Sequence, residues 1–197
     1  SSPWRIASRP TSPQVPPAHP DPDMQGFRKA FLRAIPIAYA EAERAPGMIG
    51  HANQIAWDDS KSEFEQDCGR WGRFAVPRYF AGSRELGARE LSQSLSVWSF
   101  FEALYAYAYD GTHGEVLKIS RKKFKLTFHD VAWWIREGSL PTWENAVERL
   151  HHFHDHGPSP VGFDVRHPLD EHGQRARLNP QKVAALRKSN QFREIDL

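Results

Sequence analysis

Strand-like and helix-like patterns alternate along this chain in the order strand, helix, strand, strand, helix, strand. Trp4 to Ser8 is compatible with a short edge strand, and a helix is expected from Asp23, where apolar residues recur every three or four positions. Further strands are expected over residues 48–57, 91–98 and 128–136, and two helical segments separated by Gly111 precede the last of them. This order predicts an α+β, ferredoxin-like fold with a four-stranded antiparallel sheet.

Three segments fall outside that pattern. Residues 1–22 are rich in proline and are expected to form an extended arm. Residues 58–90 form an insertion whose aromatic side chains need a surface to pack on, so we expect the insertion to cover the mouth of a pocket. After a closing helix capped by Thr142, residues 164–197 are expected to form a helical tail.

The third strand carries serines on one of its faces. Ser92, Ser94 and Ser96 alternate with apolar residues, and this polar face suits helix packing poorly. A ferredoxin-like sheet with helices on one side leaves its other face bare. We therefore expect two copies to associate through this sheet face.

Composition excludes several classes of function. The 197 residues carry a net charge of only +2, which gives no support to binding of nucleic acid or of a membrane surface. Cys68 is the single cysteine, so an internal disulfide and a thiolate metal cage are both excluded, and a cytoplasmic location is expected. No apolar run is long enough to span a membrane, and no glycine-rich phosphate loop is present.

Four short motifs carry a family resemblance. They are Val97-Trp98-Ser99, Tyr109-Asp110-Gly111-Thr112-His113, Ala132-Trp133-Trp134 and Gly157-Pro158-Ser159-Pro160. In this order they resemble the DUF3291 family of dimeric α+β barrels, distantly related to antibiotic-biosynthesis monooxygenases. The likeness is weak over residues 24–57 and good over 91–163, which places the barrel domain at residues 23–163. It implies a homodimer with a pocket enclosed by the sheets.

Tyr109 and His113 are the first candidates for catalysis. Four residues apart on a helix, they share one face, and a histidine beside a phenol can act as an acid/base pair. The alternative is that both residues only brace the helix against the neighbouring strand. His51 is a second candidate base and Asn53 a candidate donor to an oxyanion, if their face of the second strand lines the pocket.

The expected substrate is a hydrophobic small molecule. Adjacent tryptophans at 133 and 134 place one indole on each face of the sheet, and one of the two is expected to line the cavity. Arg121 falls where members of the resembled family have a basic run. The residues expected to contact the substrate are Trp98, Trp134, Asn53, Tyr105, Ser96 and Arg121.

The histidines at 151–156 invite a metal-site interpretation. His152 and His156 have the i, i+4 spacing of zinc ligands, but no third ligand with a supporting motif accompanies them. An exposed helix end, where histidines favour the negative end of the helix dipole, is the preferred interpretation. No metal is expected.

These observations predict a tailoring enzyme of secondary metabolism that acts on a polyketide- or terpenoid-like compound. The chemistry would be dehydration, cyclisation or isomerisation by acid/base catalysis, or oxygenation without a cofactor, with His113 as the base. One alternative is a haem protein, because related barrels bind porphyrin with a histidine on the second helix; His113 would then be the axial ligand. Another is a non-catalytic ligand-binding barrel.

Overall fold

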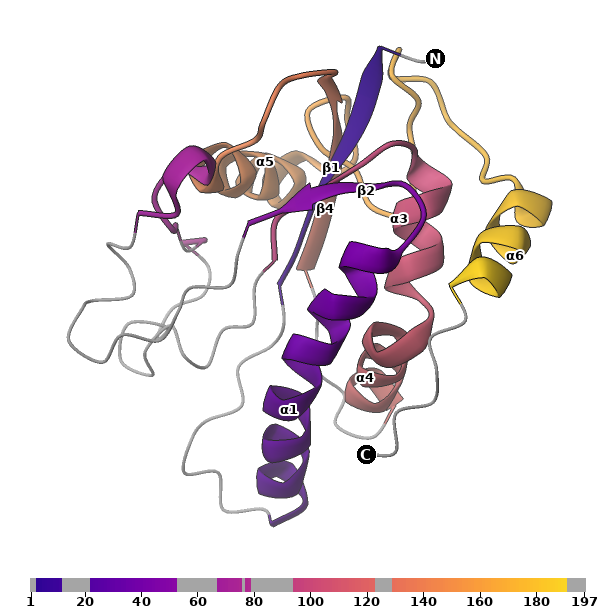
Figure 1. Cartoon of the computed structure of the whole chain (residues 1–197). Helices are drawn as coiled ribbons and strands as arrows, with labels where there is room; N and C mark the ends of the chain where they lie inside the picture. Colours follow the sequence, from indigo (N-terminus) through magenta and orange to yellow (C-terminus); the bar gives the residue numbers. More distant parts are fainter. Residues whose placement is uncertain are drawn as a thin grey trace.

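The computed structural model describes residues 3–11, 22–52, 67–75, 77–78, 94–122 and 129–190 (Figure 1). In chain order the elements are β1 (Trp4–Thr11), α1 (Pro22–Arg44), β2 (Met48–His51), the 3₁₀ turn η2 (Gly69–Trp71), β3 (Ser96–Trp98), α3 (Phe101–Ala108), α4 (Gly111–Lys122), β4 (His129–Arg136), α5 (Trp143–His156) and α6 (Pro180–Ser189).

The four strands form one antiparallel sheet in the order β2-β3-β1-β4. Together with the βαββαβ succession of elements, this order confirms the expected ferredoxin-like fold. The observed β4 matches the expected strand to within one residue. β2 and β3 are shorter than expected, and residues 53–57 and 91–93 of the expected strands lie outside the described part of the chain.

β1 is a central strand, so the expectation of a short edge strand at Trp4 to Ser8 is wrong. It pairs with β3 over Ile6–Ser8 and with β4 along its whole length. Pro10 has no backbone N–H, but it lies beyond the stretch that pairs with β3, where the missing donor breaks no bond to that neighbour. The proline therefore lies where only one neighbouring strand is paired, which is compatible with a central position of β1.

Both faces of the sheet are buried within the single chain. On one face Ile6, Trp98 and Ala132 pack beneath α3, and Phe163 joins them from the segment after α5. On the other face Val97 and its neighbours pack against α5 and the η2 segment; this cluster includes Ala7, Leu95, Val131, Trp133, Trp143 and Leu150. Figure 1 shows α5 on the side of the sheet opposite α1 and α3.

The bare sheet face expected from the serine pattern does not exist. Ser96 lies on the side of the sheet that α1 and α4 cover, and the opposite face is covered by α5 and Trp71. The physical reason is that the insertion and the closing helix supply a second apolar layer, which pattern analysis of the strands alone could not place. The argument for a dimer from a bare sheet face is therefore lost, and the family resemblance is the argument that remains.

The described part of the 58–90 insertion packs on the α5 side. Trp71 is buried and lies 3.8 Å from the position a Cβ would take at Gly50, and Phe74 meets Trp143 edge-on with ring centroids 5.0 Å apart. Glu144, near the start of α5, accepts a hydrogen bond from the backbone of Arg73. Trp71 and Phe74 are thus core residues of the second layer.

A break divides the second helical segment into α3 and α4. Gly111 has φ of +54°, a left-handed conformation that glycine adopts at little cost. Beyond the break, the carboxylate of Glu41 on α1 accepts hydrogen bonds from the backbone N (2.9 Å) and the Oγ1 (2.8 Å) of Thr112. Glu41 is 3% exposed, so a buried carboxylate caps the start of α4 from the neighbouring helix.

Segments that follow β4 contact the sheet and α3. The side chain of Thr142 accepts from the backbone N of Asn145, which confirms the expected cap of α5. Phe163 then exchanges two backbone hydrogen bonds with Ala132 of β4. In the described part of the expected helical tail, residues 164–190, the structure has the helix α6, which an ion pair between Lys182 and Glu102 joins to α3; residues 164–179 form turns and irregular segments, and residues 191–197 lie outside the described residues.

None of the helices in the described part of the chain is long and apolar enough to cross a membrane.

Replacement of Gly47 by alanine should destabilise the fold. Gly47 has φ of +91°, and an added Cβ would lie 2.7 Å from the Cβ of Ala103. Left-handed strain and overpacking together should lower the free energy of unfolding by about 1–3 kcal/mol, measured by urea denaturation. Gly26→Ala is the matched control: nothing lies within 4 Å of its Cβ position in α1, so it should leave stability unchanged or raise it. Equal effects would contradict this account of Gly47.

Removal of the Glu41 carboxylate should also cost stability. Glu41→Ala leaves the backbone N–H and the hydroxyl of Thr112 unpaired and should lower the free energy of unfolding by about 2–3 kcal/mol. Glu41→Gln keeps one acceptor and should cost about half as much. The exposed Glu115 on α4 provides the control, because Glu115→Ala should change stability by less than about 0.5 kcal/mol. A Glu41→Ala protein as stable as the control would show that the cap contributes nothing.

Candidate functional site

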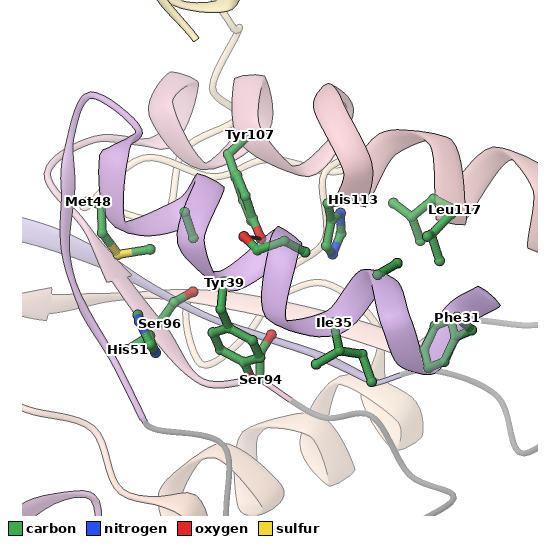
Figure 2. Close-up of a pocket in the computed structure, with 14 residues that line it drawn as sticks. Phe31, Ile35, Tyr39, Met48, His51, Ser94, Ser96, Tyr107, His113 and Leu117 are labelled. Atoms are coloured by element: carbon green, nitrogen blue, oxygen red, sulfur yellow. Dashed lines mark hydrogen bonds between the residues drawn. The ribbon is translucent and has the colours of Figure 1, made fainter. Parts of the chain in front are cut away.

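A cavity of about 80 Å³ lies between the sheet and helices α1, α3 and α4. In Figure 2, the side chains of Tyr107, His113 and Leu117 are directed from α3 and α4 toward α1 and the sheet. The lining from α1 is mainly apolar, which suits an apolar ligand. The cavity is lined by Phe31, Ala34, Ile35, Ala38, Tyr39, Ala42, Met48, His51, Ser94, Ser96, Tyr107, His113, Val116 and Leu117.

A second lobe of about 50 Å³ adjoins this cavity toward β1 and β4. The two lobes share five lining residues, so these residues stand between them: Ser94, Ser96, Tyr107, His113 and Leu117. Tyr109 and Arg121 enter the second lobe from the helices and Asp130 enters it from β4. Both lobes therefore combine apolar side chains with groups that can donate or accept protons.

The side of β2 that lines the cavity is set by a bulge. The pairing of β2 with β3 shifts register between Met48 and Gly50, so Met48 and His51 both line the cavity although they are three residues apart. Gly50 faces Trp71 on the other side, and Ile49 is 52% exposed. Strict alternation predicted Met48 and His51 on opposite faces; the bulge brings them to the same one.

His113 presents a ring nitrogen to the cavity that can accept a proton. Its Nδ1 lies 2.8 Å from the carbonyl oxygen of Ala108. A carbonyl oxygen only accepts, so Nδ1 carries the hydrogen and the neutral ring has a bare Nε2. Burial lowers the pKa of His113; the hydrogen bond to Ala108 opposes this, and the charge of Arg121 adds to it. No residue in the described part of the chain bonds Nε2.

The break between α3 and α4 creates this arrangement. In a continuous helix the carbonyl of Ala108 would accept from the backbone N–H of Thr112, four residues on. Here that N–H donates to Glu41, and the carbonyl of Ala108 accepts from the His113 ring instead. The tautomer of His113 is therefore set by a cap that comes from a different helix.

The expected sharing of one helical face by Tyr109 and His113 is wrong, because the helix is interrupted between them. The phenol beside His113 is Tyr107, with ring centroids 5.2 Å apart, and its hydroxyl donates to the carbonyl of Ala38 at 2.9 Å. Tyr109 instead packs on Tyr105 at 4.9 Å and is hydrogen-bonded to Arg121. It meets His113 only as a fellow lining residue of the second lobe.

His51 lines the first lobe, but both of its ring nitrogens have hydrogen-bond partners. Nε2 lies 3.1 Å from a carboxylate oxygen of Glu43 and Nδ1 lies 3.2 Å from the carbonyl oxygen of Ala52. Neither nitrogen is thus presented bare to the cavity, which makes His51 a weaker candidate base than His113. Asn53, its expected partner, lies outside the described residues.

The residues expected to bind substrate are divided between the cavity and the core. Ser96 lines both lobes and Arg121 lines the second. Trp98 is fully buried, donates to Ser96 Oγ at 2.9 Å and stacks on Tyr107, so it supports the wall from behind. Trp134 donates to the carbonyl of Leu169, and Tyr105 lies beneath the guanidinium of Arg187; neither lines either lobe.

Sequence analysis did not identify three titratable lining residues: Tyr39, Tyr107 and Asp130. Burial raises the pKa of both phenols, so they stay protonated and serve as donors. Asp130 was detectable in principle, because in strand alternation it shares a face with Ala132 and Trp134, where a carboxylate is out of place. Tyr107 gave no such signal, because its orientation depends on the helix break.

The insertion does not cover this cavity in its described part. Trp71 and Phe74 pack on the α5 face of the sheet, opposite the cavity, so the expected lid over the pocket mouth is wrong for these residues. Tyr79 and Phe80 lie outside the described residues. Trp71 and Phe74 pack instead in the second layer of the core.

His152 and His156 of α5 contact residues close to them in sequence. The rings of His152 and His156 stack with centroids 4.5 Å apart, and His152 Nε2 is 3.1 Å from Ser159 Oγ. Among the residues that the structure describes, no three histidine, cysteine or acidic side chains are grouped so that they could hold a metal ion.

Comparison with known families places the chain. Residues 14–179 match the family described as "Domain of unknown function (DUF3291)", a span that includes β2, β3, β4 and the helices that line the cavity. None of the curated proteins and none of the solved structures matches the chain. The match covers most of the 197 residues, and the chain is a member of the DUF3291 family.

Proposed function

We propose that this protein is an acid/base enzyme that needs no cofactor and moves a carbon-bound proton of a small, largely apolar carbonyl compound. The bare Nε2 of His113 in the wall between the two lobes carries the proposal. Isomerisation, cyclisation and dehydration of enolisable compounds all begin with such a transfer, and so does oxygenation of an enolate without a cofactor. These are the tailoring reactions that suit secondary metabolism.

The state of His113 supports a role as base. A general base must be unprotonated at working pH and must have its lone pair directed at the substrate. The lowered pKa meets the first requirement, and the hydrogen bond from Nδ1 to Ala108 meets the second by leaving the lone pair on Nε2.

The cavity supports a small substrate. Its lobes, of about 80 and 50 Å³, lie well below the roughly 300–1,000 Å³ of pockets that hold drug-sized ligands. The apolar side chains of α1 favour a hydrocarbon body. A polyketide- or terpenoid-like compound would enter with only its reacting part between α1 and α4.

A haem does not fit the described lining. His113 Nε2 is a suitable axial donor by its chemistry, but neither lobe has the volume of a porphyrin, and α1 stands across the space that the macrocycle would need. Haem binding would therefore require α1 to move, whereas the acid/base proposal does not.

The ionisation of His113 should appear in the pH dependence of stability. Because its pKa is lowered in the folded state, the unfolded chain takes up the proton first as the pH falls below the usual value of 6.5. The stability due to neutral His113 is full above 6.5 and declines as the pH falls toward the lowered pKa. His113→Gln should remove this part of the decline, seen by urea unfolding at about pH 7.5 and about pH 5.5. His172→Gln, an exposed control, should behave as the wild type.

Proton transfer can be tested before the natural substrate is known. Cyclopentanone is a suitable probe: a small apolar ring with one carbonyl, whose exchange of α-hydrogen for deuterium in D₂O is followed by proton NMR. The wild-type protein should accelerate the exchange, and His113→Gln should lower that acceleration by about 10²–10⁴-fold, as expected for loss of one positioned base.

Two outcomes would contradict the proposed function. One is a wild-type protein that binds cyclopentanone without accelerating exchange, which would indicate a ligand-binding barrel without catalysis. The other is full activity in a folded His113→Gln variant. His172→Gln should retain wild-type exchange, and circular dichroism of each variant separates loss of chemistry from loss of fold.

A further inference from the structure

We propose that Asp130 is the acid partner of His113: it holds a proton and donates it to the carbonyl oxygen of the substrate in the second lobe. This inference rests on the proposed function and extends it. It adds a second catalytic residue, and it limits the substrate to compounds whose carbonyl oxygen reaches β4 while their apolar part occupies the lobe beside α1.

The position of Asp130 is set by the sheet. It pairs with Pro10 at the start of β4, two residues before Ala132, so its side chain is on the sheet face that α3 and α4 cover. It is half-buried and lines the second lobe together with His113 and Tyr109. Both candidate groups therefore face one space of about 50 Å³.

The carboxyl of Asp130 is available to a ligand. Apart from its own backbone N–H, no residue in the described part of the chain forms a hydrogen bond or an ion pair with it. The carboxyl is half-buried in the wall of the second lobe, which His113 also lines.

The surroundings of Asp130 favour its protonated form. Burial raises the pKa of Asp130 and the carboxylate of Asp164 raises it further; Arg121 and Arg166 act in the opposite direction. Tyr109 is the other titratable group at this end of the lobe, and the charge of Asp130 contributes to the raised pKa of that phenol. A carboxylic acid kept neutral in this way can donate a hydrogen bond or a proton.

His113 and Asp130 are shifted in opposite directions. Burial moves the pKa of His113 down and that of Asp130 up, so the lobe disfavours the charged form of each group. A neutral imidazole can take a proton and a neutral carboxylic acid can give one. Pairs of titratable groups whose environments tune them in this way are how acid and base roles are recognised in active sites.

The reaction balances with these two groups alone. The C–H bond next to the carbonyl breaks and its proton goes to His113 Nε2. The electron pair of that bond forms the carbon–carbon double bond, and the carbonyl oxygen takes the proton of Asp130. The product is the enol, with an imidazolium at His113 and a carboxylate at Asp130. Return of a proton to carbon from His113, and of the enol proton to Asp130, resets both groups.

Infrared difference spectroscopy of bound cyclopentanone tests the role of Asp130 separately from turnover. A donor at the carbonyl oxygen weakens the C=O bond, so the wild-type protein should shift the carbonyl stretch to lower frequency. Asp130→Val, which suits a strand but has no donor, should abolish the shift. His113→Gln should keep it, because that variant loses the base and retains the donor. Glu148→Gln, an exposed acidic control on α5, should match the wild type.

The exchange assay supplies the second measurement. Asp130→Asn keeps a hydrogen-bond donor but has no acidic proton, so it should retain part of the infrared shift and lose about 10²–10⁴-fold in exchange rate. The wild-type rate should rise with pH as His113 becomes neutral and fall as Asp130 ionises. The decline on the alkaline side should be absent in Asp130→Asn.

The outcomes separate the two proposals. A carbonyl shift that survives in folded Asp130→Val, or that is absent from the wild-type protein, overturns the role of Asp130. Unchanged exchange in Asp130→Asn also overturns it. A carbonyl shift that requires Asp130 in a protein that catalyses no exchange would keep Asp130 as a binding residue and reject the enzymatic function. Loss of exchange in His113→Gln alone would keep the base and reject the acid.

Discussion

The break between α3 and α4 is the constraint on which the candidate site depends. A buried carboxylate on α1 caps α4, which withdraws the Thr112 N–H from its place in a continuous helix and leaves the carbonyl of Ala108 to the His113 ring. One interaction between helices thus fixes the tautomer of the histidine, brings Tyr107 beside it and turns Tyr109 toward Arg121. Without Glu41, the same residues in a straight helix would present a different set of groups to the cavity.

The second layer of the core explains why the cavity is on the helix side of the sheet. A four-stranded sheet with one bare face must find a partner, and in this chain the partner is internal: α5 and the η2 segment bury Val97, Trp133 and their neighbours. The other face carries serines where large apolar residues would be needed to fill the space under α1 and α4. Small polar side chains at Ser94 and Ser96 leave that space open, and the two lobes occupy it.

The chemistry of the site follows from desolvation more than from charge pairing. His113 and Asp130 form no ion pair in the described part of the chain, and the cost of burying charge shifts the pKa of each toward the neutral form, although Arg121 and Arg166 oppose this at Asp130. Tyr39 and Tyr107 are kept as donors for the same reason. A cavity of this kind suits a neutral substrate whose reaction transfers protons and needs no strong electrostatic field.

The sequence by itself determined the order of the elements, the ferredoxin-like fold, the cap at Thr142, the family and the candidacy of His113, because periodicity, capping and motifs are local properties of the chain. The tertiary structure decided the rest. The central place of β1, the bulge that turns both Met48 and His51 to the cavity, and the burial of Trp71 against α5 all depend on partners distant in sequence. Tyr107 joined the site for the same reason, because spacing gives the direction of a side chain only while an element stays regular. The carboxylate that caps α4 comes from α1, about 70 positions earlier in the chain.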